Sequence, residues 1–250
     1  MGGTGVLGPS GYYVDEVENN LNDISELLQD QTSSFGYGVI GMQEVDKETI
    51  RSRGIDVSAY MAQKIFPSYS HSHFAANVSF RKGEYGNAVV TNIGVIKTQE
   101  VKFTKTRREQ RGAVATKLSF GNGKFLWFVN CHLQTIESDA LKEAKEMVDW
   151  IKTFDRSIPT IVVGDFSIVR REDNKSGYDK LIGILSTPDL PGFKEVCPDV
   201  LTFKENRQFD FMFVYDGSEE LNFSCKAIRQ QKGTMELSDH SALVAKFHWQ

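Results

Sequence analysis

The sequence lacks the features that mark membrane-spanning, secreted and multidomain proteins. No apolar run approaches the length of a membrane-spanning helix, and the glycine-rich residues Met1–Gly11 do not follow the basic-then-apolar order of a signal peptide. No proline- or glycine-rich linker divides the 250 residues. These absences predict a soluble, unsecreted chain that folds as one domain over residues 1–250.

Cysteine and positive charge are also scarce. The three cysteines, Cys131, Cys197 and Cys225, are an odd number without metal-like spacing, which favours reduced thiols and an intracellular setting, while leaving room for one disulfide. The formal net charge of -4 gives the chain no global basic field that would attract nucleic acid. A local basic patch is compatible with these totals.

The sequence does contain a set of predicted apolar strands that end in acidic, histidine or other polar residues. Ile161–Ser167 reads Ile-Val-Val-Gly-Asp-Phe-Ser, a continuous apolar run that is typical of a strand covered on both faces. Alternation would place Asp165 and Ser167 on one side and Phe166 on the other. The alternative is that Asp165 and Ser167 only open a turn.

Further polar residues occupy similar positions. Tyr37–Val45 is a strand predicted to end at Glu44, and Phe125–Leu133 is a strand that places Asn130 and His132 on one face. In Phe209–Tyr215 both faces are apolar, so Asp210 looks inward and needs a partner. Asp239 and His240 directly precede a last strand in Leu237–Val244. The basic run Lys105–Arg111 leads into the strand Ala113–Leu118, so Arg111 could reach a cavity at the strand ends.

Helical periodicity separates these strands. Apolar spacing predicts helices over Asp15–Gln29, Val57–Phe66, Asp139–Phe154 and Tyr178–Leu185, with Asp56 or Ser58 as the cap of the second. Asn77–Phe80 and Ala88–Asn92 are predicted strands of a hairpin whose turn contains Gly86 and Asn87. A strand, a helix and a strand in succession form a crossover unit, which indicates an α/β fold.

Four carboxylates and two histidines at strand ends suit a hard, oxygen-ligated cation together with general acid–base chemistry. These six residues are Glu44, His132, Asp165, Asp210, Asp239 and His240. Any one of them alone is a weak signal, because a single acid at a strand end is usually solvated. A purely structural role for all six would require several buried charges without a task.

Six short motifs follow one another along the chain: Gln43-Glu44, Tyr85-Gly86-Asn87, Asn130-Cys131-His132-Leu133, Gly164-Asp165-Phe166, Phe209-Asp210-Phe211 and Ser238-Asp239-His240. In this order they resemble the endonuclease/exonuclease/phosphatase family of metal-dependent hydrolases. Arg111-Gly112-Ala113 and Thr202-Phe203 also look like the family's small-hydrolase branch. The resemblance spans about Val17–Phe247. It implies a four-layer α/β sandwich with two facing mixed β-sheets flanked by helices, a Mg²⁺ site that Mn²⁺ could also fill, and cleavage of a phosphate ester, with nucleic acid among the substrate classes.

The resemblance also implies roles for individual residues. Glu44 would ligate the metal with Asp239 close by, and His240 paired with Asp210 would act on the phosphate or orient the attacking water. Asp165 would hold or deprotonate that water, and His132 would act around the departing oxygen. The substrate-binding residues would be Asn87, Arg111, Asn130 and Ser167.

Two departures from the family pattern stand out. The family has Gly-Asp-Phe-Asn where this chain has Ser167, and Met1–Tyr13 contains no asparagine and no counterpart of the family's first strand. We therefore expect either a truncated chain or an incomplete site. The leading hypothesis is a Mg²⁺-dependent phosphodiesterase, and the competing hypothesis is a catalytically weakened family member that serves as a binding or scaffold protein.

Overall fold

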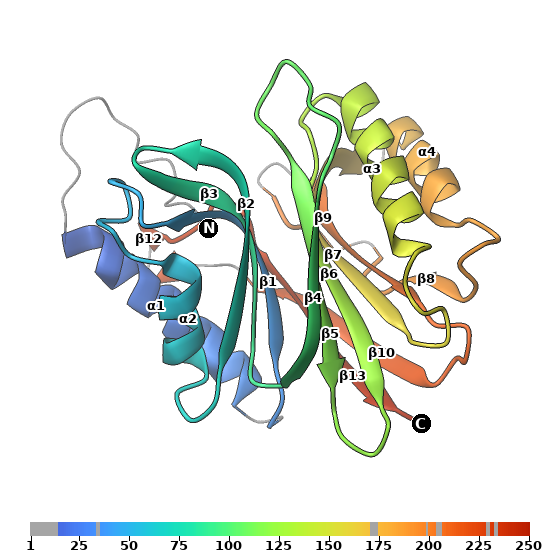
Figure 1. The fold of residues 1–250 in the computed structure, drawn as a ribbon, viewed down its shortest axis with the longest axis horizontal. Coiled ribbons are helices and arrows are strands. Elements are labelled where there is room, and N and C mark those ends of the chain that lie inside the picture. The colour runs from blue at the N-terminus through green and yellow to red at the C-terminus, as the bar shows by residue number, and fades with distance from the viewer. Residues whose placement is uncertain are drawn as a thin grey trace.

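Two β-sheets pack face to face, and a pair of helices covers the outer face of each (Figure 1). The computed structural model describes residues 15–33, 36–170, 175–198, 200–203, 207–228, 231–232 and 235–250. Within them the order of layers is helices, sheet, sheet, helices, which confirms the predicted four-layer α/β sandwich. Met1–Tyr13, which is expected to lack the family's first strand, lies outside the described residues.

The smaller sheet is antiparallel and has the strand order β1-β3-β2. Its strands are β1 (Val39–Lys47), β2 (His71–Phe80) and β3 (Gly83–Thr91). Helices α1 (Asp15–Thr32) and α2 (Val57–Ile65) cover it, and the predicted apolar stripe of α1 is buried through Leu21, Ile24 and Leu28. Asp56 caps α2 by accepting a hydrogen bond from the Ala59 amide at 3.0 Å.

The larger sheet has the strand order β4-β5-β6-β7-β9-β8. Its strands are β4 (Gly94–Lys102), β5 (Gly112–Ser119), β6 (Phe125–His132), β7 (Thr160–Arg170), β8 (Phe193–Glu195) and β9 (Gln208–Tyr215). Strands β6 and β7 are parallel and joined through α3 (Glu137–Ile151), so the predicted crossover is confirmed. Helix α4 (Ser176–Leu185) packs with α3 on the outer face.

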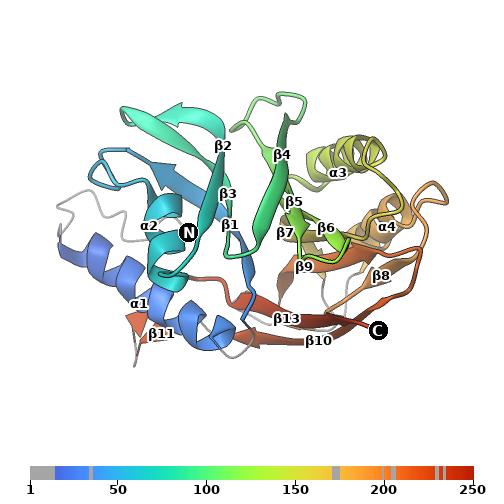
Figure 2. The ribbon, with the colours of Figure 1, turned by 60° about the horizontal axis from the view of Figure 1, so that its bottom comes forward.

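A third hydrophobic cluster fills the space between the two sheets. The antiparallel pair β10 (Leu221–Ile228) and β13 (Ala242–Trp249) runs along one side of the sandwich and packs apolar side chains against this cluster (Figure 2). The short pair β11 (Gln231–Lys232) and β12 (Met235–Glu236) precedes β13. Among the described helices, none is long and apolar enough to cross a membrane.

Two local predictions about the smaller sheet are wrong. The β2–β3 turn is only Arg81-Lys82, so Gly86 and Asn87 lie inside β3. Gly86 is needed there because a Cβ would lie 2.0 Å from the Ala75 carbonyl oxygen. Strand β1 does not end at Glu44 but continues to Lys47 through a bulge, because the pairing register shifts between Met42 and Val45.

The expectation of reduced thiols also needs correction. Cys197, just after β8, and Cys225, in β10, form a disulfide with their Cα atoms 5.6 Å apart, and only Cys131 is a free, buried thiol. Sequence spacing does not reveal this pair, because β8 and β10 become neighbours only when the sandwich closes.

Candidate active site

Three of the predicted strand-end residues, His132, Asp165 and Asp210, lie in one row across the larger sheet, and Gly112 stands at the end of that row. In the strand register Gly112 pairs with His132, His132 with Asp165, and Asp165 with Asp210. The row therefore runs from the start of β5 through β6 and β7 to β9. Ligand sites in layered α/β folds gather at such strand ends, and this row forms the floor of the candidate active site.

Asp165 lies where β7 stops being regular. Gly164 has φ 148° and Ser167 has φ 51°, and the register of β7 with β9 shifts after Asp165. The Ser167 amide donates to Asp165 Oδ1 at 2.7 Å, and the Ser167 hydroxyl lies 3.1 Å from the same oxygen and 3.2 Å from the Leu133 carbonyl. Phe166 is fully buried on the other side, so Asp165 and Ser167 share one side as predicted.

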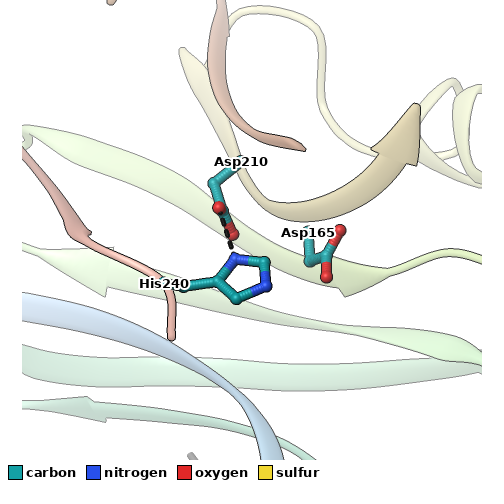
Figure 3. Close-up of side chains that lie close together, drawn as sticks. All are labelled: Asp165, Asp210 and His240. Carbon is teal, nitrogen blue, oxygen red and sulfur yellow. Dashed lines mark hydrogen bonds and ion pairs between the residues drawn. The ribbon is translucent and has the colours of Figure 1, made fainter. Parts of the chain in front are cut away.

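Asp210 and His240 form a direct pair. His240 Nδ1 lies 2.7 Å from Asp210 Oδ2, and Asp165 approaches the same imidazole from another side (Figure 3). Burial alone would lower the pKa of His240, but the hydrogen bond and charge of Asp210, with the charges of Asp165 and Asp239, raise it to about 9. His240 is therefore protonated at neutral pH.

Asp165 is affected in the opposite direction. Burial and then the nearby charge of Asp210 raise the pKa of its carboxyl group above the ordinary range, although His240 and the Ser167 hydrogen bonds oppose this. A carboxylate with a raised pKa is a stronger base than a solvated one. This environment suits a group that accepts a proton from water.

His132 and Arg111 extend the site toward β5. His132 Nε2 lies 3.6 Å from Asp165 Oδ2, and His132 Nδ1 lies 3.3 Å from Arg111 Nη1. Burial and then the Arg111 charge lower the pKa of His132 well below its usual value, so His132 is neutral and its Nδ1 accepts from Arg111. Arg111 is buried, and its Nε has no partner among the described residues.

Glu44 lies on the opposite sheet, in the bulge of β1. Its φ is 57°, its side chain is exposed, and the Tyr85 hydroxyl donates a hydrogen bond to it. Burial and then the charges of Glu44 and Glu109 raise the pKa of Tyr85, while Arg111 opposes them, so the phenol stays neutral. Tyr85 thus holds Glu44 through a hydrogen bond and lies close enough to Arg111 to be affected by its charge.

The two asparagines predicted to bind substrate are both fully buried between the sheets. Asn130 donates to the carbonyls of Met42 and Ala88 at 2.9 and 3.0 Å and accepts from Gln43, so its amide is fully used in joining the sheets. Asn87 donates to the Gly112 carbonyl at 2.9 Å, and its Oδ1 has no partner in the described part of the chain.

A possible metal-ligand group is formed by Asp165, Asp210 and His240, whose ligand atoms all lie within 4.8 Å of one another. Glu44 and Asp239, the two residues predicted to hold the cation, are exposed and do not belong to such a group within the described residues. The structure therefore brings His132, Asp165, Asp210, His240 and Arg111 together, and leaves Glu44 and Asp239 at the exposed rim.

Sequence reasoning missed two residues of this site. Tyr85 was part of a recognised motif, but only the fold shows its contact with Glu44. Thr202 is fully buried; its hydroxyl accepts from the amides of Phe209 and Asp210 at 3.3 and 3.2 Å, and its carbonyl accepts from the Ser241 amide at 2.7 Å. The only sequence signal for Thr202 was its place in the Thr202-Phe203 motif.

Comparison with solved structures identifies the fold. A protein of the endonuclease/exonuclease/phosphatase family from Leptotrichia buccalis superposes with a TM-score of 0.73 at 18% identity, covering 96% of each chain. One from Bacteroides vulgatus gives 0.69 at 17% identity, covering 94% of each. TDP2 of D. rerio, in complex with a single-strand DNA product, gives 0.66 at 14% identity, covering 92% of this chain and 93% of that one.

Comparison of sequences adds nothing to this. No protein-family model matches the chain, and no curated protein matches it either. The solved structures confirm the fold that the ordered motifs implied. Their sequences are only 14% to 18% identical to this chain, so the likeness is one of fold.

Proposed function

We propose that this chain, which has the fold of the endonuclease/exonuclease/phosphatase proteins, is a Mg²⁺-dependent phosphodiesterase. The observation that carries the proposal is the single row of Gly112, His132, Asp165 and Asp210 across the larger sheet, with His240 held on Asp210 at 2.7 Å. The cluster thus combines the Asp165 carboxylate as a base, the protonated imidazole of His240 and the neutral imidazole of His132. Phosphoryl transfer requires such positioning and charge neutralisation.

The proposed role of each residue follows from its protonation state. Asp165, whose pKa is raised by burial and by Asp210, orients the attacking water and accepts its proton. Protonated His240, fixed by Asp210, neutralises a phosphate oxygen. Neutral His132 donates from Nε2 near the departing oxygen. Arg111, on the side of β5, offers its charge and its Nε, which has no partner in the described part of the chain.

The donor set fits a divalent cation. Mg²⁺ prefers oxygen ligands, keeps several waters and is commonly held by one or two carboxylates together with substrate phosphate. We propose Glu44 and Asp239 as these carboxylates, because both are exposed and neither forms an ion pair with the row within the described residues. His240, in contrast, is protonated and engaged by Asp210. When bound, the cation would polarise the phosphate.

The test is hydrolysis by purified protein of a small chromogenic phosphodiester, a phosphomonoester and a single-stranded oligonucleotide, with Mg²⁺ and with EDTA. We expect metal-dependent turnover of a phosphodiester and a loss of roughly a hundredfold or more in Asp165→Asn. Asp149→Asn, an exposed acid on α3, is the matched control and should turn over like wild type. Turnover that is independent of metal or survives Asp165→Asn would remove the proposal.

Calorimetric titration of Mg²⁺ tests the cation ligands separately. Binding should weaken in Glu44→Gln and in Asp239→Asn and should be kept in Asp149→Asn. If only Asp165→Asn weakens binding, the cation belongs to the group of Asp165, Asp210 and His240 instead.

A second function is favoured by one observation, the hydroxyl of Ser167. It is engaged by Asp165 and the Leu133 carbonyl, where the family's asparagine would supply amide donors. A family member weakened in this way could act as a binding or scaffold protein. Absence of turnover for every phosphate ester, with Mg²⁺ binding retained, would favour this alternative.

A further inference from the structure

The connection between β4 and β5 is the most basic surface segment of the chain. Residues 103–111 carry a net charge of +3 in a chain whose formal net charge is -4. Lys105, Arg107 and Arg108 are exposed, and none of the three forms an ion pair with any other described residue. Three unpaired cations within four residues are a strong local attraction for an anion.

This segment, which we call the basic loop, begins and ends beside the candidate active site. Lys102 and Gly112, the strand residues on either side of it, pair with each other, and Gly112 pairs in turn with His132. The basic loop therefore rises from the end of the same row that contains Asp165, next to α3 (Figure 1). Arg111, its last residue, lies against His132.

Hydrogen bonds hold the basic loop in one conformation. The Phe103 amide donates to the Arg111 carbonyl at 3.0 Å, and the Gln110 side chain donates to both of their carbonyls. Gln134, which is buried just after β6, donates to the Thr106 hydroxyl at 3.2 Å and to the Glu109 carbonyl. A loop whose backbone is fixed in this way pays the ordering cost at binding only for the side chains of its cations.

A groove of about 600 Å³ separates the basic loop from α3. Its lining includes Lys105, Arg107, Arg108 and Lys142 around the exposed side chain of Ile136. The volume lies within the range of ligand sites, and a cationic rim around an apolar side chain suits a group with both phosphate and apolar parts.

The groove also contains acids, but each is already occupied. Glu146 accepts from the Thr104 amide at 2.7 Å, and the buried Glu143 accepts from the Gln134 amide at 2.7 Å. Asp139 lies 3.8 Å from the Lys142 ammonium. The acids therefore anchor the walls of the groove, and the cations of the basic loop remain available to a ligand.

We propose that the groove between the basic loop and α3 binds the phosphodiester backbone of a single-stranded nucleic acid that extends from the active site. The proposal rests on the proposed function, because it takes the scissile phosphate to lie at Asp165. A concave groove with one exposed apolar residue favours a strand over a lipid surface, which needs an apolar insertion. The exposed apolar side chain of Ile136 beside the cations also suits a single strand, whose bases are accessible, better than a duplex, whose bases are stacked inside.

The test measures binding without catalysis. In the Asp165→Asn background and in EDTA, a fluorescently labelled oligo-dT is titrated at several salt concentrations. Replacing Lys105, Arg107 and Arg108 together by Gln should weaken binding roughly 10- to 100-fold at about 50 mM salt. It should also reduce the slope of log K against log salt by about 2, since each phosphate contact to a single strand contributes about 0.7.

The matched control replaces three exposed lysines that do not line the groove, Lys97, Lys124 and Lys194, by Gln. It changes the net charge equally and should leave affinity and slope close to those of the parent. Equal losses in both triple variants would mean a nonspecific charge effect and would overturn the proposal. So would an unchanged oligo-dT affinity together with lost binding to phosphatidylserine vesicles, which would assign the basic loop to a membrane. Because the assay needs no turnover, its result is independent of whether the phosphodiesterase proposal holds.

Discussion

At the scale of single residues, Ser167 combines two unusual properties. Its backbone is in the left-handed region at φ 51°, where asparagine is several times more common than other non-glycine residues. Its amide and hydroxyl both contact Asp165 Oδ1. Ser167 thus has a backbone conformation that suits asparagine, but it lacks the longer amide side chain of the family's motif.

We therefore predict that Ser167→Asn folds normally and raises the rate of the chemical step. An amide reaches further than a hydroxyl, and one preorganised donor to a developing negative charge typically contributes about 3 kcal/mol, or roughly a hundredfold in rate. Single-turnover measurements at saturating substrate and Mg²⁺ report this step. Ser167→Ala, which adds no donor, is the control and should not be faster than wild type. A Ser167→Asn variant slower than wild type would show that the hydroxyl itself has a task.

The Asp210–His240 pair leads to a prediction about pH. The pKa of His240 is raised to about 9, so the imidazolium is present below that pH and is lost as the pH rises through it. The value of kcat/KM should therefore fall above about pH 9. In Asp210→Asn the charge that raises the pKa is gone, so the alkaline limb should move to lower pH. An unmoved limb would mean that another group titrates.

The same pair predicts non-additive losses. Asp210→Asn and His240→Gln should each reduce the rate roughly a hundred- to ten-thousand-fold. Because the two residues share one task, the double variant should lose little more than the worse single variant. Fully additive losses would show that the pair does not act as a unit.

At the scale of secondary-structure elements, the sequence predicts the regular parts better than the irregular ones. The strand over Ile161–Ser167 and the helix beginning at Asp15 follow from apolar periodicity, because burial of one face or both repeats along the element. The bulge at Glu44 and the kink at Ser167 have no such repeat. They depend on contacts with a neighbouring strand, which the order of residues does not reveal.

Thr202 joins the start of β9 to the segment that carries His240. Its hydroxyl holds the start of β9 through the Asp210 amide, and its carbonyl holds the segment that carries His240 through the Ser241 amide. Phe203 adds a β-bridge to His240, and its ring packs edge-on against the imidazole with centroids 4.8 Å apart. Thr202 is therefore a positioning residue for the Asp210–His240 pair.

We predict that Thr202→Val lowers kcat with little change in KM, because it displaces the pair without touching substrate. It should also destabilise the fold by about 1–3 kcal/mol, since two partly buried amides lose their acceptor. Thr202→Ser keeps the oxygen and should restore kcat. Steady-state kinetics and thermal unfolding of both variants test this. A Thr202→Val protein that is less stable yet has the kcat of wild type would reduce Thr202 to a purely structural role.

At the scale of the whole molecule, the site exists because distant strands meet in register. The motifs predicted that His132, Asp165, Asp210 and His240 would converge, and the fold places them together. The sequence could not predict that the Asn130 amide would have all its hydrogen-bonding groups engaged between the sheets. It also could not predict that Arg111 would be buried against His132. The first outcome depends on how closely the two sheets approach, and the second on the pairing of β5 with β6.

The Cys197–Cys225 disulfide connects the larger sheet with the β10–β13 pair and encloses the segment that contains Thr202 and Asp210. With a sequence separation of 28, the loop-closure model assigns it a stabilisation of about 3–4 kcal/mol. We predict that dithiothreitol, or Cys225→Ser, lowers the melting temperature, and that the reductant has no further effect on Cys225→Ser. The Cys131→Ala variant should keep the full response to reductant, because Cys131 is unpaired and buried. Counting thiols in denatured, unreduced protein should find one per chain. Three thiols, or a melting temperature that reductant does not change, would show that the pair is reduced and that the sandwich is held closed by packing alone.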